Sequence, residues 1–127
     1  MPSRIAEYEL TKFLKKELGE ALKLKLEEVG FHFIKKEKRF RGKKFDLYTY
    51  DKKSRRFVIW ELEIAQPSCE LNVCKVENTI LDFSWEPKVY MFHIFSPRRK
   101  SAKKPCLEEV KKLKAKYPRR FVYMQLD

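Results

Sequence analysis

A chain of 127 residues fits one domain of common size, so residues 1–127 are treated as a single domain. Its 43% hydrophobic residues suffice for a core, whereas no run of 18 apolar residues is present, which excludes a membrane-spanning segment. The net charge of +12 favours a polyanionic partner.

The first half of the chain predicts one long helix and then three strands. From Ser3 to about Val29, leucines recur at helical spacing, and Gly19 marks the place where this helix could break. Three runs rich in aromatic and β-branched residues follow, "FHFIKKEKRF", "KFDLYTYD" and "RFVIWELEI". The short segments "RGK" and "DKKSR" between them are typical of hairpin turns, so we expect an antiparallel meander.

The second half alternates helices and strands. Residues 69–83 predict a helix, and "KVYMFHIFSP" predicts a strongly apolar strand. The segment "KKPCLEEVKKLKAKY" predicts a helix with Pro105 near its start, and "RRFVYMQL" predicts a last strand. The order α-β-β-β-α-β-α-β indicates an α/β fold of the α+β kind, with a mixed sheet covered by helices.

Cysteine content and composition constrain the setting. Cys69, Cys74 and Cys106 form no CxxC pair, and no signal segment opens the chain, so we expect a cytoplasmic protein without zinc. Charged residues make up 38% of the chain and Asn, Gln and Gly are few, which leans toward a thermophilic source.

Positive charge flanks an acidic centre. Residues 31–56 carry eleven basic and three acidic groups, residues 57–97 carry two and six, and residues 98–120 carry eleven and two. Basic runs of this kind can follow a phosphate backbone, because each neutralised phosphate releases counterions. The candidate nucleic-acid-binding residues are Lys35, Lys36, Lys38, Arg39, Arg41, Lys43, Lys44, Arg98, Arg99 and Lys100. The alternatives are a solvated lysine surface and, less favoured, an anionic membrane surface.

Two glutamates interrupt the apolar strand "FVIWELEIAQ" at residues 57–66. Side chains alternate along a strand, so Glu61 and Glu63 share the face of Phe57 and Ile59. Two like charges held together need a cation, a shared proton or basic side chains. A hairpin would bring Asp46 beside them, and three carboxylates would suit Mg²⁺ or Mn²⁺ together with substrate phosphate. Asp46, Glu61 and Glu63 are therefore the candidate metal ligands.

At these residues the sequence resembles the PD-(D/E)XK nuclease superfamily, which contains restriction endonucleases and archaeal Holliday junction resolvases. The likeness rests on the order α-β-β-β-α-β, an aspartate in the second strand and an acidic doublet in the third. It implies a restriction endonuclease-like core in which Asp46 is the family aspartate and Glu61 is the acid of the doublet. Glu63 stands where most members have lysine, although a minority of restriction enzymes also carry glutamate there.

The resemblance also directs attention to the two predicted helices beside these strands. Many members place a glutamate on the first helix, and Glu20 has about the family spacing before Gly30, with Glu17 as the rival. Lys75 could replace the missing lysine from the next helix, where Asn72 and Asn78 share its face. Surface ion pairs and a solvated helix face are the alternatives.

Other polar residues near these positions have weaker signals. Gln66 could contact substrate or begin a turn, and His93 in its apolar strand is interpreted as a core histidine.

Two functions follow from these expectations. The first is a metal-dependent endonuclease that hydrolyses DNA, with Asp46, Glu61, Glu63, Glu20 and Lys75 as the catalytic set. The second is a catalytically inactive nucleic-acid-binding or assembly module on the same fold. A homodimer is one expectation for its assembly, and no membrane association is expected.

Overall fold

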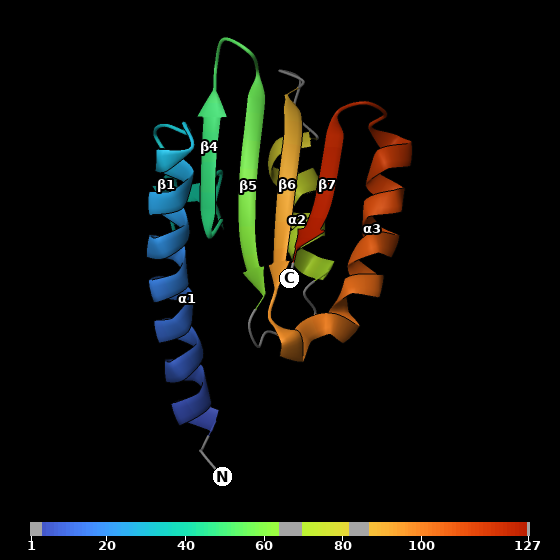
Figure 1. The fold of residues 1–127 in the computed structure, drawn as a ribbon. Helices are drawn as coiled ribbons and strands as arrows, with labels where there is room; N and C mark the ends of the chain where they lie inside the picture. Colours follow the sequence, from blue (N-terminus) through green and yellow to red (C-terminus); the bar gives the residue numbers. More distant parts are fainter. Residues whose placement is uncertain (1–3, 64–69, 82–86, 127) are drawn as a thin grey trace.

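A mixed sheet of five strands carries the fold in the computed structural model, which describes residues 4–63, 70–81 and 87–126 (Figure 1). Its strands lie in the order β1-β4-β5-β6-β7. They are β1 (Lys35–Lys36), β4 (Leu47–Asp51), β5 (Arg56–Glu63), β6 (Lys88–Phe95) and β7 (Phe121–Leu126). The helices are α1 (Arg4–Glu28), α2 (Glu70–Val76), the π-helix η1 (Glu77–Leu81), the 3₁₀ segment η2 (Pro97–Ala102) and α3 (Lys103–Lys116).

The sheet is antiparallel on one side and parallel on the other. β1, β4 and β5 pair antiparallel, and a short loop joins β4 to β5. In that loop the Asp51 carboxylate accepts hydrogen bonds from the Lys53 amide at 3.0 Å and the Ser54 hydroxyl at 2.9 Å, which fixes the turn. β6 pairs parallel with both β5 and β7, and parallel neighbours are joined by crossover connections. Helix α2 lies in the connection from β5 to β6, and α3 lies in the connection from β6 to β7.

The two faces of the sheet pack against different helices. On one face Phe57 and Ile59 of β5 lie beside Val89 and Met91 of β6, in the larger core that also takes in buried residues of α2 and α3. On the other face Trp60 packs with Leu47 and Ile34, and the partly buried Leu22 and Leu26 of α1 lie against them. Alternation along β5 therefore assigns each side chain to one of two cores.

The first helix runs without a break through Gly19. The alternative break is wrong because the glycine is not a hinge but a close approach, at which an added Cβ would lie 3.6 Å from the Lys36 side chain. Of the predicted leucine stripe from Leu14 to Leu26, only the later part packs against the sheet. Leu14 and Leu18 are exposed, whereas Leu22 and Leu26 are packed. Ser3, the expected first residue of the helix, lies outside the described residues.

The first strand of the expected meander is much shorter than predicted. Only Lys35–Lys36 joins the main sheet, and a separate hairpin follows, formed by β2 (Arg39–Phe40) and β3 (Lys43–Lys44). Arg41 and Gly42 both have positive φ, at 51° and 83°, which is typical of a tight type I′ turn and confirms the turn at "RGK". The backbone of Glu37 is also left-handed, at a φ of 51°, and it diverts the chain between β1 and β2.

The remaining elements agree with the sequence. The mixed α/β class is confirmed, and the predicted last helix and last two strands correspond to α3, β6 and β7. In the predicted helix at 69–83, the described part begins as α2 and continues as the π-helix η1. Across the described parts of the chain, the helices lack the combination of length and apolar character that a bilayer span requires.

Candidate functional site: two carboxylates and two lysines

The candidate site lies at the end of the sheet where β5 and β6 finish and β4 begins (Figure 1). Asp46 directly precedes β4, and Glu61 lies near the end of β5. The antiparallel register pairs Leu47 with Trp60, so the next residues on each strand, Asp46 and Glu61, come opposite one another. The hairpin therefore brings these two carboxylates together, as the sequence predicts.

Asp46 is held by two groups from different parts of the fold. Its Oδ1 accepts a hydrogen bond from the Lys15 ammonium of α1 at 3.2 Å. Its Oδ2 accepts one from the backbone amide of Leu62 in β5 at 2.7 Å. The side chains of Lys15 and Asp46 are largely buried, at 14% and 15% exposed, so solvent screens this ion pair less than it screens a surface pair.

Glu61 is almost fully buried and faces a lysine from the next helix. The Lys75 ammonium of α2 lies 2.9 Å from Glu61 Oε1. Lys75 also donates to the Lys44 carbonyl at 2.7 Å and to Asn72 Oδ1 at 3.2 Å, so its three polar partners come from three elements. The ammonium lies 4.6 Å from the centre of the Phe45 ring, which adds a cation–π contact.

The electrostatics of Glu61 follow from this crowding. Burial is the main cause that raises the pKa of Glu61 well above its ordinary value, and the charge of Asp46 and a hydrogen bond with it raise it further. Lys75 opposes this by lowering the pKa. We refer to Asp46, Glu61, Lys15 and Lys75 as the acid–lysine cluster.

The third predicted ligand, Glu63, takes part in a different group of contacts. It shares the face of Glu61 but is fully buried, and its Oε1 lies 2.7 Å from His93 Nε2. The Asn72 side-chain amide also donates to this oxygen. Among the described residues, no three His, Cys, Asp or Glu side chains gather in a way that could hold a metal ion. The structure therefore brings together Asp46 and Glu61 but does not bring Glu63 into a three-carboxylate group.

The first helix contributes a lysine to the cluster, not the glutamate that the sequence indicated. Glu20 accepts a hydrogen bond from Lys36, which is the main cause that lowers the pKa of Glu20, and its side chain is half exposed. Glu17 is exposed. Lys15 was not predicted as a site residue. It lies on the stripe of α1 that faces the sheet, together with Gly19 and Leu22. A lysine on the face of a helix that packs against the sheet is the signal that could have revealed it.

Lys75, by contrast, lies where the sequence predicted. Asn72, one turn before it, is in contact with it, whereas Asn78 is exposed beyond the end of α2. Gln66, the residue suggested for substrate contact, lies outside the described residues.

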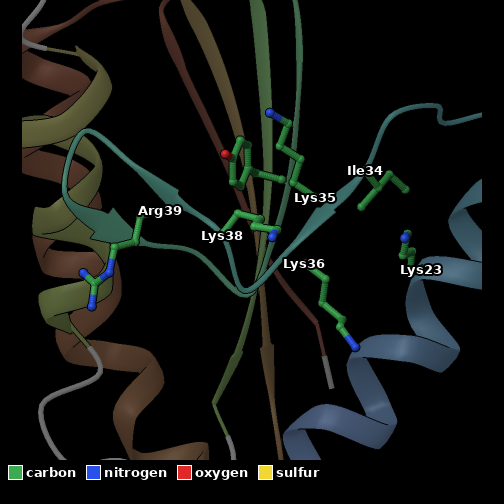
Figure 2. A pocket seen from close by; sticks show the side chains of 7 residues that line it. Lys23, Ile34, Lys35, Lys36, Lys38 and Arg39 are labelled. Carbon is green, nitrogen blue, oxygen red and sulfur yellow. The ribbon is translucent and has the colours of Figure 1, made fainter.

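Five cationic side chains line a hollow of about 490 Å³ beside β1 (Figure 2). Four of them were predicted to bind nucleic acid, and Lys23 of α1 is an addition; together they are Lys23, Lys35, Lys36, Lys38 and Arg39. Figure 2 shows Lys36 extending toward α1, from which Lys23 comes. The basic residues of this segment therefore form a concave surface between α1 and the small hairpin.

The other basic candidates occupy two further places. Arg41, Lys43 and Lys44 are exposed on the β2–β3 hairpin. Arg99 lies on η2, which follows β6 at the same end of the sheet as the acid–lysine cluster (Figure 1). The side chains of Arg98 and Lys100 are outside the described set.

A comparison of this chain with family models, curated proteins and solved structures finds no match. The geometry of the site is therefore the basis for its functional interpretation.

Proposed function

We propose that this chain is a metal-dependent endonuclease that hydrolyses phosphodiester bonds in DNA, on a restriction endonuclease-like core. The observation that carries the proposal is the Asp46–Glu61 carboxylate pair with the Lys75 ammonium 2.9 Å from Glu61. Two acids on neighbouring strands and a lysine beside them are the groups that the resembled superfamily uses. Here the lysine comes from α2 and not from the strand.

The donor set of the site fits a hard divalent cation. Mg²⁺ and Mn²⁺ prefer oxygen ligands, and Mg²⁺ is usually held by one or two carboxylates together with water and substrate phosphate. Asp46 and Glu61 would supply these carboxylates. Burial is the main cause that raises the pKa of Glu61 and the charge of Asp46 raises it further, so a bound cation would favour the ionised form of both. When bound, the metal would polarise the phosphate and favour ionisation of an attacking water.

The residues of the cluster have separate tasks in such a reaction. The Leu62 amide and the Lys15 ammonium fix the orientation of the Asp46 carboxylate. Lys75 presents an ammonium beside the carboxylates, where it would stabilise negative charge that develops on the phosphate. Burial of the cluster makes these fixed charges more effective than they would be in bulk water.

The basic surface supports the same proposal. Cationic side chains beside β1 and on the β2–β3 hairpin would follow the phosphate backbone without reading the base sequence. Lys75 donates to the carbonyl of Lys44, so the hairpin that carries these charges is attached directly to the catalytic lysine. A bound backbone would therefore lead toward the acid–lysine cluster.

A nicking assay on supercoiled plasmid tests the proposal. The wild-type protein should nick DNA with Mg²⁺ or Mn²⁺ and not with EDTA. Asp46→Asn and Glu61→Gln should each lose at least about 100-fold in rate, as the removal of a key electrostatic group does. Glu108→Gln, an exposed change on α3, is the matched control and should leave the rate unchanged. Nicking by Asp46→Asn at the wild-type rate would place the chemistry elsewhere.

One observation favours the second function, an inactive nucleic-acid-binding or assembly module. Lys15 and Lys75 each form an ion pair with one of the two carboxylates, so the cluster can be a structural charge network without a metal. This function predicts salt-dependent DNA binding with no nicking under any metal. The same assay therefore separates the two.

A further inference from the structure

We propose that Glu63 and His93 are positioning residues that hold the Lys75 ammonium in place through the Asn72 side chain. The inference rests on the proposed nuclease function for its catalytic meaning, but the contacts that carry it are independent of that function. It assigns a role to the buried glutamate that does not join the acid–lysine cluster.

Asn72 connects the two groups because its amide has two different ends. Its Nδ2 donates to Glu63 Oε1, and its Oδ1 accepts from the Lys75 ammonium at 3.2 Å. The reverse orientation would place the amide oxygen against a carboxylate and the amide nitrogen against an ammonium, so the partners fix which way the amide points. An asparagine fixed in this way offers Lys75 an acceptor at one defined position.

His93 fixes the other side of Glu63. His93 Nε2 lies 2.7 Å from Glu63 Oε1, and its Nδ1 lies 2.7 Å from the Tyr123 hydroxyl. That hydroxyl also accepts a hydrogen bond from Gln125 Nε2 at 3.2 Å. A carboxylate accepts hydrogen bonds, so His93 Nε2 is the donor to Glu63, and both ring nitrogens of the histidine have a partner.

The far end of this series is tied to the scaffold. Gln125 also donates to the Lys103 carbonyl at the start of α3, at 2.8 Å. Burial is the main cause that raises the pKa of Tyr123 far above its ordinary value, so its hydroxyl stays protonated. Glu63 and His93 are both fully buried, and they belong to the adjacent parallel strands β5 and β6. Asn72 is therefore supported by the rigid centre of the sheet.

Lys75 needs such support because its side chain is flexible. Fixing a free lysine side chain costs rotamer entropy, and the helix α2 that carries Lys75 is only seven residues long. A lysine placed on the strand itself would be held by the sheet backbone. In this chain the corresponding strand position holds Glu63, which supports a lysine supplied from the helix.

The test compares Asn72→Ala with Asn78→Ala, an exposed asparagine next to the same helix, in protein carrying ¹³C-labelled lysine. The ε-carbon resonance of Lys75, assigned by its loss in Lys75→Arg, should move in Asn72→Ala and not in Asn78→Ala. Glu63→Gln, which keeps the shape of the buried side chain, should move it as well. A Lys75 resonance that is unchanged in Asn72→Ala and Glu63→Gln overturns the proposal, whether or not the protein cleaves DNA.

Nicking rates supply the second readout. If Asn72 acts only through Lys75, the double variant Asn72→Ala/Lys75→Ala should be no slower than Lys75→Ala alone. Losses that multiply in the double variant would overturn the proposal. If the wild-type protein never nicks DNA, but the Lys75 resonance moves in Asn72→Ala and Glu63→Gln as expected, the nuclease function is refuted and the positioning contacts are supported.

Discussion

Replacement of Lys75 by methionine measures how strongly the acid–lysine cluster depends on its lysine. Methionine retains an unbranched apolar side chain but removes the ammonium that lies 2.9 Å from Glu61. Glu61 is 2% exposed and would be left as a buried carboxylate beside Asp46. The stability of the variant should therefore depend on whether Glu61 is ionised.

The expected loss can be worked out at two pH values. Removal of one partner of a buried ion pair costs about 3–5 kcal/mol of unfolding free energy. Glu61 can avoid the cost of a buried unpaired charge by binding a proton. For a carboxyl with the ordinary pKa of 4.5, protonation costs about 4.8 kcal/mol at pH 8 and about 0.7 kcal/mol at pH 5. The lost hydrogen bonds to Lys44 and Asn72 add roughly 1 kcal/mol at both pH values. We expect a loss of about 4–6 kcal/mol at pH 8 and about 1–2 kcal/mol at pH 5.

The sign follows from proton linkage. The pKa of Glu61 is raised in the folded state, so the folded protein binds this proton more tightly than the unfolded chain does. Stability therefore falls as pH rises from the ordinary value of 4.5 through the raised one. Lys75 lowers the pKa of Glu61, so its loss raises this pKa further and widens the pH range over which stability is lost.

The measurement is urea unfolding, followed by circular dichroism at pH 8 and pH 5 with EDTA present. Lys25→Met is the control, because Lys25 forms an exposed pair with Glu28 at 3.4 Å and should lose less than about 0.5 kcal/mol at either pH. Equal losses for Lys75→Met at the two pH values would refute the assignment of the effect to Glu61. A loss at pH 8 no larger than that of the control would show that the ion pair is not buried in solution.

Three further outcomes are expected. Millimolar Mg²⁺ should raise the melting temperature of the wild type, because a ligand at 100 times its dissociation constant adds about 2.7 kcal/mol to the free energy of unfolding. The melting temperature of Asp46→Asn should not change. An equal rise in both proteins would exclude Asp46 as a ligand. Lys38→Glu should lower the slope of log affinity for duplex DNA against log salt by about 0.9 or more, whereas Lys111→Glu, exposed on α3, should not. Gly19→Ala should stabilise the protein by about 0.5–1 kcal/mol in urea unfolding, because an alanine Cβ would make an ordinary contact with Lys36; a destabilised variant would contradict the helix packing.

The sequence predicts the carboxylate pair because the signal is local. Asp46 and Glu61 are joined by one hairpin, and the alternation of a strand determines which way each side chain points. The contact of Glu63 with His93 could not be predicted in this way. It depends on the register of two parallel strands, which is set by a crossover and not by a turn.

The rotation of the first helix was the other unpredictable element. By spacing alone, Leu14 and Leu18 are as suitable for burial as Leu22, and only the position of the sheet selects Leu22 and Leu26. The same rotation brings Lys15 to Asp46. The hairpin at Arg41–Gly42 was predicted from its glycine, whereas the left-handed backbone of Glu37, which shortens β1, carries no such signal.

The placement of Lys15 has a consequence for local unfolding. Among the described residues, α1 contributes nothing to the larger core and packs against the smaller one only through Leu22 and Leu26. The turns that precede Leu22 can therefore open without global unfolding, at a fraction of the total free energy. Each such opening would carry the Lys15 ammonium away from Asp46 while Glu61 and Lys75 stay in place. The charge balance of the cluster is thus coupled to fraying of the first helix.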